Sequence, residues 1–298
     1  MDTLRIKSRR IHAALAQDAA CRDDEAGSVI VVAHTHDIEI VGERVRKTFV
    51  SWADGEPDRE WAALTYLDEH ARGLCPRPIT RELVAGRPAV VMSRVHGDPL
   101  TGKLSSRQHA ALATALRRLF AVTVPVDLAV RANGPVEFPR RFGPWVAEEY
   151  DWCLCQDAAL VRQAVDVSAS WLRGFHVGTD WIKDPVVALG DGNLDNVLWD
   201  GDTCRLIDWE EYGVSDLCYE IADVVEHASS RLERRLDVEA LLASVNLNVA
   251  QQMRMEEYRR MFACFWLAML LPGNGGWRRN PPGSTEDQAR HVLDLMNR

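Results

Sequence analysis

Hydrophobic and polar positions alternate along the first third of the chain as they do in strands. Five runs rich in β-branched residues are separated by short polar turns, at 28–33, 38–41, 44–50, 79–84 and 88–95. Runs of this length and alternation predict strands of a half-buried sheet, and the first two predict a hairpin. A helix is predicted between the third and fourth strands, beginning near Pro57, because proline suits a first helical turn. Another is predicted ahead of the sheet, with apolar positions from Leu4 to Leu15 and an end before the charged turn at 22–27.

The other two thirds of the chain have mainly helical periodicity. Helices are predicted at about 105–120, 145–154, 158–172, 216–228, 231–245, 250–271 and 284–297, with an extended linker at 122–139 and a break at 273–277. The first of these begins with a capping box, Ser105 with Gln108. Three aliphatic runs, at 186–189, 197–199 and 204–207, predict short buried strands among the helices.

The loops next to these three short strands carry the most informative side chains. Asp191 and Asn196 lie on either side of a tight loop, and Asp208 follows the next hairpin. Together they can supply one base and two oxygen ligands for Mg²⁺, which takes few protein ligands because it keeps several of its waters. The pattern therefore predicts a catalytic base with a magnesium site.

Two other readings of this stretch stay open. Asp191, Asn193 and Asp195 begin a calcium-loop pattern, but Asn196 stands where that loop needs glycine and Asp202 where it needs glutamate. Alternatively, the polar side chains only cap and turn the chain between strands.

The order D-x-x-x-x-N, a hydrophobic strand and a second Asp resembles the aminoglycoside phosphotransferase and choline kinase branch of the protein-kinase-like fold. In that family the loop reads H-G-D-x-x-x-x-N, and the metal-binding Asp lies in I-D-W-E or I-D-F-E. Gly190-Asp191, Asn196 and the run 207–210 match this pattern, whereas Leu189 stands where the family usually has His. The departure leaves the base and the metal ligands in place, but it raises the question of what braces the loop.

The resemblance also assigns roles in the predicted sheet. Lys47, on the third strand, would hold the α- and β-phosphates of ATP. Glu60 shares the apolar face of the following helix with two leucines, so it needs a cation, and Lys47 is the nearest one; the alternative is a first-turn acid that faces solvent. The fifth strand would end in a hinge at which Met92, Ser93 and Val95 meet the adenine.

Two further groups of residues receive expected roles. The segment 215–222 resembles the family's G-D-x-x-Y-D-L-A, which implies that Asp216 supports the catalytic loop; Asp216 is also expected to cap a helix. The predicted helix at 145–154 is acidic and aromatic, and it either presents carboxylates and a ring face to an amine-bearing substrate or is a solvated acidic face with tryptophans in the core. The candidate substrate-binding residues are Glu148, Glu149, Asp151, Trp152, Glu210 and Glu211.

A competing phosphate-binding motif lies at 97–103, which reads G-x-x-x-x-G-K after a strand and before a helix. Leu104 replaces the Ser or Thr whose hydroxyl holds Mg²⁺. Pro99 removes an N–H from a loop that works by pointing N–H groups at phosphate. A P-loop NTPase that uses Lys103 is therefore the less favoured reading.

Composition limits the number of domains, the kinds of partner and the cellular compartment to expect. The 298 residues suit roughly two domains, and the net charge of -9 disfavours a nucleic-acid-coating surface while allowing a cationic small substrate. Seven cysteines without a C-x-x-C pair indicate a reducing compartment. The first residues lack the pattern of a secretory signal, and no apolar run reaches the roughly 18 residues of a membrane span. We therefore expect a cytoplasmic protein without nucleic-acid or membrane partners.

These observations predict an α+β, protein-kinase-like fold of two lobes, with an antiparallel-sheet N-lobe at 1–95 and a mainly helical C-lobe at 96–298. The implied activity is the ATP- and Mg²⁺-dependent transfer of the γ-phosphoryl group to a hydroxyl of a small molecule. The acceptor class includes aminoglycosides and other hydroxylated antibiotics, which would make the protein an antibiotic-resistance enzyme, as well as amino alcohols. The alternative, motivated by Leu189, is a nucleotide-binding or regulatory module of the same fold that has lost catalysis.

Overall fold

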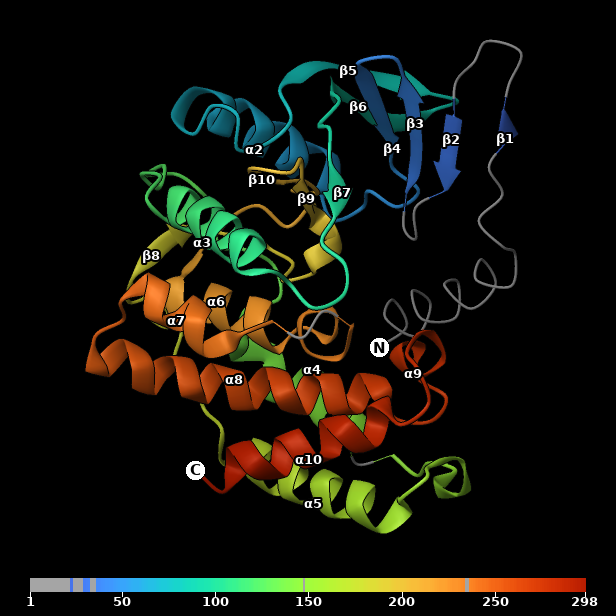
Figure 1. Cartoon of the computed structure of the whole chain (residues 1–298), viewed down its shortest axis with the longest axis vertical. Helices are drawn as coiled ribbons and strands as arrows, with labels where there is room; N and C mark the ends of the chain where they lie inside the picture. The colour runs from blue at the N-terminus through green and yellow to red at the C-terminus, as the bar shows by residue number, and fades with distance from the viewer. Residues whose placement is uncertain (1–21, 24–28, 33–35, 147, 234–235) are drawn as a thin grey trace.

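The computed structural model describes residues 22–23, 29–32, 36–146, 148–233 and 236–298 (Figure 1). The helix predicted at residues 4–15 lies outside these ranges.

A six-stranded antiparallel sheet forms the upper part of the molecule in Figure 1, with the strand order β1-β2-β3-β4-β6-β5. Its strands are β1 (Arg22–Asp23), β2 (Val29–Val32), β3 (Asp37–Val41), β4 (Arg44–Thr48), β5 (Pro78–Val84) and β6 (Arg87–Ser93). The five strands predicted from the alternation are all present, and β1 is an addition. Residues 89–92 of β6 are buried, since this strand lies between β4 and β5.

Helix α2 (Glu56–His70) contacts β5 and β6. It begins after Gly55, whose φ of 83° is accessible to glycine without strain, and Pro57 lies in its first turn. Glu60, Leu64 and Leu67 are buried on the same face. The prediction that Glu60 faces inward is therefore confirmed, and the solvent-facing alternative is wrong.

Two small sheets accompany the large one; β7, β9 and β10 lie next to the large sheet in Figure 1, whereas β8 lies among the helices, near α3 (Ser106–Phe120). One has the order β10-β9-β7 and the other pairs β11 with β8. Their strands are β7 (Asp98–Pro99), β8 (Pro185–Val187), β9 (Val197–Trp199), β10 (Cys204–Leu206) and β11 (Val214–Asp216). The three predicted short strands correspond to β8, β9 and β10.

The rest of the chain is mainly helical and packs into one continuous hydrophobic core, which also includes Phe49, just after β4, and Leu194, in the loop between β8 and β9. The helices are α3 (Ser106–Phe120), α4 (Phe138–Val146), α5 (Ala158–Gly174), α6 (Leu217–Glu226), α7 (Val238–Val245), α8 (Val249–Leu270), α9 (Gly275–Arg279) and α10 (Ser284–Met296). The predicted capping box at the start of α3 is confirmed, because Ser105 and Gln108 exchange both hydrogen bonds. No helix of the described ranges is long and apolar enough to cross a membrane.

The prediction of a helix at 145–154 is wrong. Residues 148–151 are not helical; α4 lies upstream of them, and a short 3-10 turn, η2 (Trp152–Leu154), follows. The linker predicted at 122–139 is confirmed over residues 122–134, but Pro135 and Pro139, which were included in it, do not lie in a linker. In fact they begin a 3-10 turn, η1 (Pro135–Glu137), and the first turn of α4, positions at which the missing N–H of proline costs no intrahelical bond.

Two boundaries in the last quarter also differ from the prediction. The single helix expected at 231–245 is replaced by a π-helical turn, η4 (Ser229–Glu233), and by α7, which Asp237 caps by accepting a hydrogen bond from the Ala240 N–H. Continuous apolar periodicity hid the cap at Asp237. The break predicted at 273–277 contains the short helix α9.

Candidate active site

The loop between β8 and β9 presents Asp191 and is held close to its neighbours by two glycines. Gly190 has a φ of 88°, and a Cβ added there would lie 2.6 Å from the Cβ of Glu211. A Cβ added to Gly192 would lie 2.5 Å from the main chain of Asp223 in α6. Real Cβ contacts do not reach such distances, so only glycine lets the loop pack directly on these segments.

Asp191 and Asn196 form a pair across this loop. Asn196 Nδ2 donates to Asp191 Oδ2 at 3.2 Å, and the Asn193 N–H donates to Asp191 Oδ1 at 3.0 Å. Burial, together with the negative charge of Asp208, raises the pKa of Asp191 to about 6. The side chain is nevertheless 45% exposed, so a hydroxyl group can reach a carboxylate whose pKa suits a base near neutral pH.

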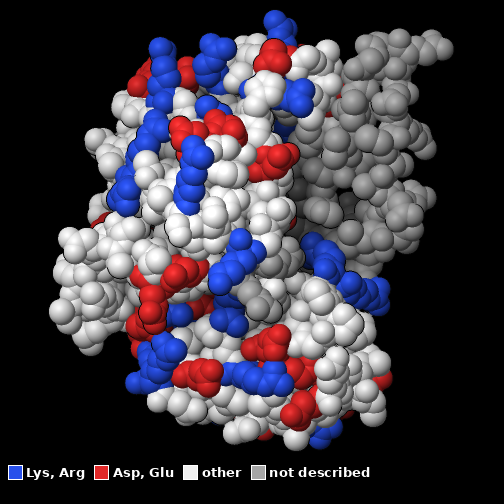
Figure 2. Space-filling view, in the orientation of Figure 1, with Lys and Arg blue, Asp and Glu red and all other residues white. Residues whose placement is uncertain are grey.

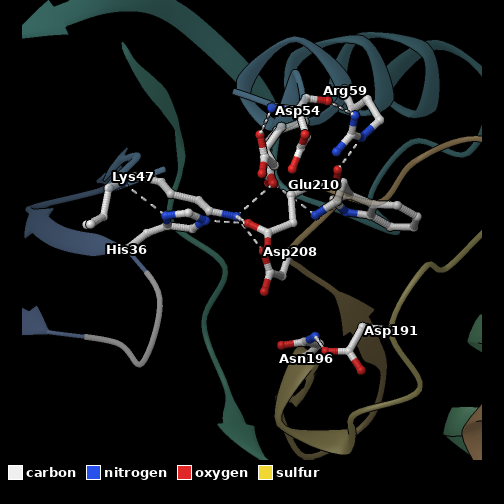
Figure 3. Close-up of polar contacts among 12 residues, drawn as sticks. His36, Lys47, Asp54, Arg59, Asp191, Asn196, Asp208 and Glu210 are labelled. Carbon is white, nitrogen blue, oxygen red and sulfur yellow. Dashed lines mark hydrogen bonds and ion pairs between the residues drawn. The ribbon is translucent and has the colours of Figure 1, made fainter. Parts of the chain in front are cut away.

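A second group of charges converges on Lys47 in β4 (Figure 3). Its Nζ lies 2.9 Å from Glu60 Oε2 and 3.0 Å from Glu210 Oε2, and it also pairs with Asp208. The Lys47 side chain is only 6% exposed. Burial opposes its charge, but the three carboxylates outweigh that effect and raise the pKa of Lys47. Lys47 is therefore a permanently charged group at neutral pH.

Glu60 links this group to the segment after β10. Its Oε2 accepts the Trp209 N–H at 3.0 Å, and the Trp209 ring is fully buried. Asp208 itself has a φ of 69°, the left-handed region that a non-glycine residue occupies only when its surroundings hold it there. The strained backbone and the Glu60 contact together fix the direction in which Asp208 points.

Glu210 lies beside Lys47, and its second contact is with His36, whose Nε2 is 2.6 Å from Glu210 Oε2. Burial opposes the charge of Glu210, but His36 and Lys47 prevail and lower its pKa to about 2. Arg59 Nε donates to the Glu210 carbonyl at 2.5 Å, which ties α2 to the same segment. Glu210 thus belongs to the Lys47 group, and its expected contact with the acceptor stays a prediction.

The sequence matches the model of the phosphotransferase enzyme family known as APH over residues 31–257. The chain belongs to this family. A search of the curated proteins finds no match to this chain. The match includes β3 to β6 of the large sheet and the segment that carries Asp191, Asn196 and Asp208.

Solved structures with the same fold come from both branches that the sequence resembles. A choline/ethanolamine kinase family protein from Mesorhizobium loti is 14% identical with a TM-score of 0.58, covering 100% of this chain and 95% of its own. The aminoglycoside phosphotransferase APH(4)-Ia is 16% identical with a TM-score of 0.53, covering 98% of each chain. Choline kinase from Cryptosporidium parvum is 13% identical with a TM-score of 0.57, covering 92% and 90%. The predicted family and the predicted two-lobe α+β fold are confirmed.

The catalytic loop of this family member is braced by Glu220 and Arg131. Glu220 Oε2 accepts the N–H groups of Leu189 and Gly190 at 2.8 and 3.2 Å. Arg131 donates to Glu220 Oε1 and to the Gly190 carbonyl, each at 2.6 Å, and all of these side chains are buried. Leu189 therefore needs no histidine to be held, since its main chain is bound by Glu220 while its side chain lies in the core.

Asp216 supports a different point from the one expected. It caps α6 through the Cys218 N–H and accepts the N–H groups of Lys183 and Asp184, each at 2.9 Å, just before β8. Its effect on the catalytic loop is therefore indirect, through the position of β8, and Glu220 is the direct brace. Glu220 had a signal in the family segment at 215–222, whereas Arg131 had none, because it lies in the stretch read as a linker.

The three expected hinge residues lie at the end of β6 and just after it. Met92 is buried in β6, and the Ser93 N–H is bound by the Arg77 carbonyl at 2.9 Å. The N–H and C=O of Val95 have no hydrogen-bond partner within the part of the chain that the structure describes. Val95 is thus the hinge residue whose main chain is open to a ligand, and its contact with adenine stays a prediction.

The other expected substrate residues divide into two groups. Glu148 and Glu149 are exposed, Asp151 caps η2, and Trp152 lies 5.2 Å from the guanidinium of Arg162. Within the described ranges no hydrogen bond or ion pair joins these four to Asp191, Asn196 or Asp208. Glu211, in contrast, lies against Gly190 at the catalytic loop.

The P-loop reading and the calcium-loop reading both disagree with the geometry of the structure. In the stretch read as a P-loop, Asp98 and Pro99 pair with β9, and α3 begins only at Ser106, after the exposed Lys103. The P-loop reading is therefore wrong. In the calcium-type pattern, Asn193 Oδ1 accepts the Asp195 N–H and caps a 3-10 turn between strands, and no group of three or more His, Cys, Asp or Glu side chains that could hold a metal occurs among the described residues.

Proposed function

We propose that the protein transfers the γ-phosphoryl group of ATP to a hydroxyl of a small molecule. The observation that carries the proposal is the meeting of two groups from distant parts of the chain. Lys47 comes from the sheet and pairs with Glu60 of α2, and Lys47 also contacts Asp208, which lies after β10 and whose charge acts on Asp191. A phosphate-binding cation, a metal ligand and a base in one place are the parts that phosphoryl transfer needs.

The donor set fits Mg²⁺. Asn196 spends its Nδ2 on Asp191, so its carbonyl oxygen is the atom left for a metal, and Asp208 offers a carboxylate. These are hard oxygen donors from two residues, and Mg²⁺ prefers few protein ligands of this kind. When bound, Mg²⁺ would neutralise charge on the phosphates of the nucleotide.

Lys47 binds and orients the phosphates in this proposal. It starts from contacts with three carboxylates, and the triphosphate replaces Asp208 as its partner while Glu60 keeps its direction. The hydrogen bond from the Trp209 N–H holds Glu60 during that exchange. The hinge at Val95 supplies an N–H and a C=O for the adenine edge. In this proposal the N-lobe ends at Val95 and the C-lobe begins at residue 96.

Asp191 orients the acceptor hydroxyl and takes its proton. Most of the rate would come from positioning and charge stabilisation, because phosphoryl transfer needs little covalent chemistry from the protein. Proton transfer by a positioned base contributes about 10²–10⁴-fold in such steps.

The acceptor is a hydroxylated and preferably cationic small molecule. Glu211 packs against Gly190, the residue before Asp191, and the net charge is -9. Lys and Arg do not gather in one broad patch on the face shown in Figure 2. A variant of APH(4)-Ia with the same fold was solved with ADP and hygromycin B, and spectinomycin phosphotransferase APH(9)-Ia with AMP. Aminoglycosides, other hydroxylated antibiotics and amino alcohols are thus the acceptors to test, and an aminoglycoside would imply a resistance enzyme.

The six described cysteines are unpaired, which suits the reducing environment of the cytoplasm.

An acceptor screen tests the proposal. ADP release is followed with ATP and Mg²⁺ across aminoglycosides, other hydroxylated antibiotics, amino alcohols and sugars, with Asp191→Asn as the matched control. We expect at least one acceptor to stimulate ADP release in the wild type and not in the variant, with a phosphorylated product. ATP binding without stimulation by any class would indicate a nucleotide-binding module instead.

A further inference from the structure

A histidine that the sequence analysis did not single out lies next to Asp191. His227 directly follows α6, and its side chain is 13% exposed. The ring packs edge-on against Trp266 of α8, with 4.4 Å between the centroids and 78° between the planes. Its Nε2 lies 3.6 Å from Asp191 Oδ1. This distance is that of an ion pair and is slightly longer than a hydrogen bond.

The surroundings of the other ring nitrogen fix which one carries the proton. The Ser229 N–H donates to His227 Nδ1 at 3.1 Å, so Nδ1 must offer a lone pair. Ser229 Oγ, which accepts the Leu194 N–H at 3.0 Å, lies 2.7 Å from the same nitrogen, and its hydroxyl hydrogen can share the Nδ1 lone pair that the Ser229 N–H engages. A neutral ring with an acceptor at Nδ1 carries its hydrogen on Nε2, the nitrogen that faces Asp191.

The same contacts join His227 to the catalytic loop at two points. Ser229 holds the loop through the Leu194 main chain, and Nε2 faces the Asp191 carboxylate. The close packing of Gly192 on the main chain of Asp223 brings the end of α6 within reach of the loop. The ring is therefore fixed by Ser229 on one side and by Trp266 on another.

Asp191 then has unequal oxygens. Oδ1 faces both the Asn193 N–H and His227 Nε2, whereas Oδ2 has one donor among the described residues, Asn196 Nδ2. A hydroxyl proton is accepted most readily by the oxygen with the free lone pair, which is Oδ2. Catalytic contacts that are long without substrate often shorten in the complex.

We propose that His227, set in its Nε2–H form by Ser229, is a positioning residue that directs the Asp191 carboxylate so that Oδ2 faces the acceptor hydroxyl. This role rests on the proposed function. The hydroxyl proton ends on Asp191, and His227 donates a hydrogen bond without taking that proton.

The kinetic test compares His227→Ala and His227→Gln with a control. We expect His227→Ala to lower kcat by about 10–100-fold, the usual effect of losing a partner that orients a reacting group, with KM for ATP unchanged. His227→Gln, whose amide can donate towards Asp191, should recover most of the loss. The control is His291→Gln, since His291 is a similarly buried histidine at 15% exposure that pairs with Glu226 at 2.6 Å. It should change Tm and leave kcat alone.

A wild-type kcat in His227→Ala would overturn the inference. So would a Gln variant as slow as the Ala variant, or a loss of kcat that the His291 control reproduces at an equal change in Tm. A purely structural histidine gives these last two results, because its replacement acts through folding rather than through the direction of Asp191.

A spectroscopic measurement separates this inference from the proposed function. The ¹⁵N signals of His227, assigned by their absence in His227→Gln, should show the Nε2–H form in the wild type, and Asp191→Asn should shift them. The Nδ1–H form, or signals that ignore Asp191→Asn, would refute the positioning role even in an active enzyme. If no acceptor is phosphorylated but both spectroscopic results hold, the contact stands and the proposed function fails.

Discussion

The two halves of the candidate site are held by different forces. On the side of Lys47, one buried ammonium faces the carboxylates of Glu60, Asp208 and Glu210. On the side of Asp191, main-chain N–H groups of the loop end on side-chain acceptors, and two glycines allow direct packing. The first half has more negative than positive charge, so it gains from a bound cation. The second half is already arranged before any ligand arrives.

The difference indicates which half changes on binding. Ion pairs around Lys47 can exchange partners, because the charge of Asp208 can pass from Lys47 to a metal. Main-chain contacts at Leu189, Gly190 and Leu194 have no such alternative, and breaking them would leave buried N–H groups unpaired. We therefore expect changes on the Asp191 side to affect turnover, and changes on the Lys47 side to affect nucleotide binding.

The largest expected effect is that of Asp191→Asn. Turnover should fall by about two orders of magnitude or more, the contribution of a lost general base, with ATP affinity nearly unchanged. Asp195→Asn is the matched control, since Asp195 is an exposed acid on the same loop. Steady-state rates and nucleotide titrations compare the two, and equal losses in both variants would remove Asp191 from its role.

The next effect separates the two lysines. Lys47→Ala should cripple ATP binding and destabilise the fold by about 3–5 kcal/mol, because Glu60 is then left without its buried partner. Lys103→Ala, at an exposed position, should change stability by less than about 0.5 kcal/mol. Adding Glu60→Gln to Lys47→Ala should recover stability and not ATP binding. Denaturant melts and nucleotide titrations check this, and a harmless Lys47→Ala would overturn the site.

A smaller effect tests the packing of the catalytic loop. Gly192→Ala must push the loop away from Asp223, at a cost of about 1–3 kcal/mol, and should lower turnover while ATP still binds. Gly143→Ala in α4 is the control, because a Cβ there meets nothing within 4 Å. Turnover that is equal in both alanine variants would mean that the loop is not fixed by this contact.

The pH dependence gives the smallest effect. The pKa of Asp191 is raised to about 6, so the group keeps its proton below that pH and acts as a base only above it. The plot of log kcat/KM should rise with pH through about 6 and then level off. The raised pKa of Asp191 also affects stability. Between pH values of about 4 and 6 the folded state binds a proton at Asp191 that the unfolded state has lost, so the contribution of this group to folding stability falls as pH rises. Asp191→Asn should therefore be no less stable than the wild type at pH 7, and an activity limb near pH 4 would contradict the assignment.

The ordered set Lys47, Glu60, Asp191, Asn196 and Asp208 could be predicted because each residue lies on an element with a clear local pattern. Strand alternation placed Lys47, helical periodicity turned Glu60 inward, and short aliphatic runs framed the loops. The contacts of Glu210 with His36 and Lys47 could not be predicted, since nothing local in the sequence shows that these residues meet it.

Arg131, His36 and His227 could not be predicted. Each reaches the site from a loop or from the end of an element, where no periodicity indicates direction, and its role depends on contacts between residues more than 30 positions apart in the chain. The missed start of α4 has the same origin. Proline in a first turn and proline as a breaker look alike until the neighbouring turn is known.

In the proposed site, Asp208 serves Mg²⁺ and the nucleotide, while Asp191 serves only the acceptor. Titration of ATP with and without Mg²⁺ into the wild type, Asp191→Asn and Asp208→Asn tests it without knowledge of the acceptor. We predict that Mg²⁺ tightens ATP binding by at least about tenfold, or ~1.4 kcal/mol, in the wild type and in Asp191→Asn, and has little effect in Asp208→Asn. Equal Mg²⁺ dependence in all three proteins, or its loss in Asp191→Asn alone, would contradict the account.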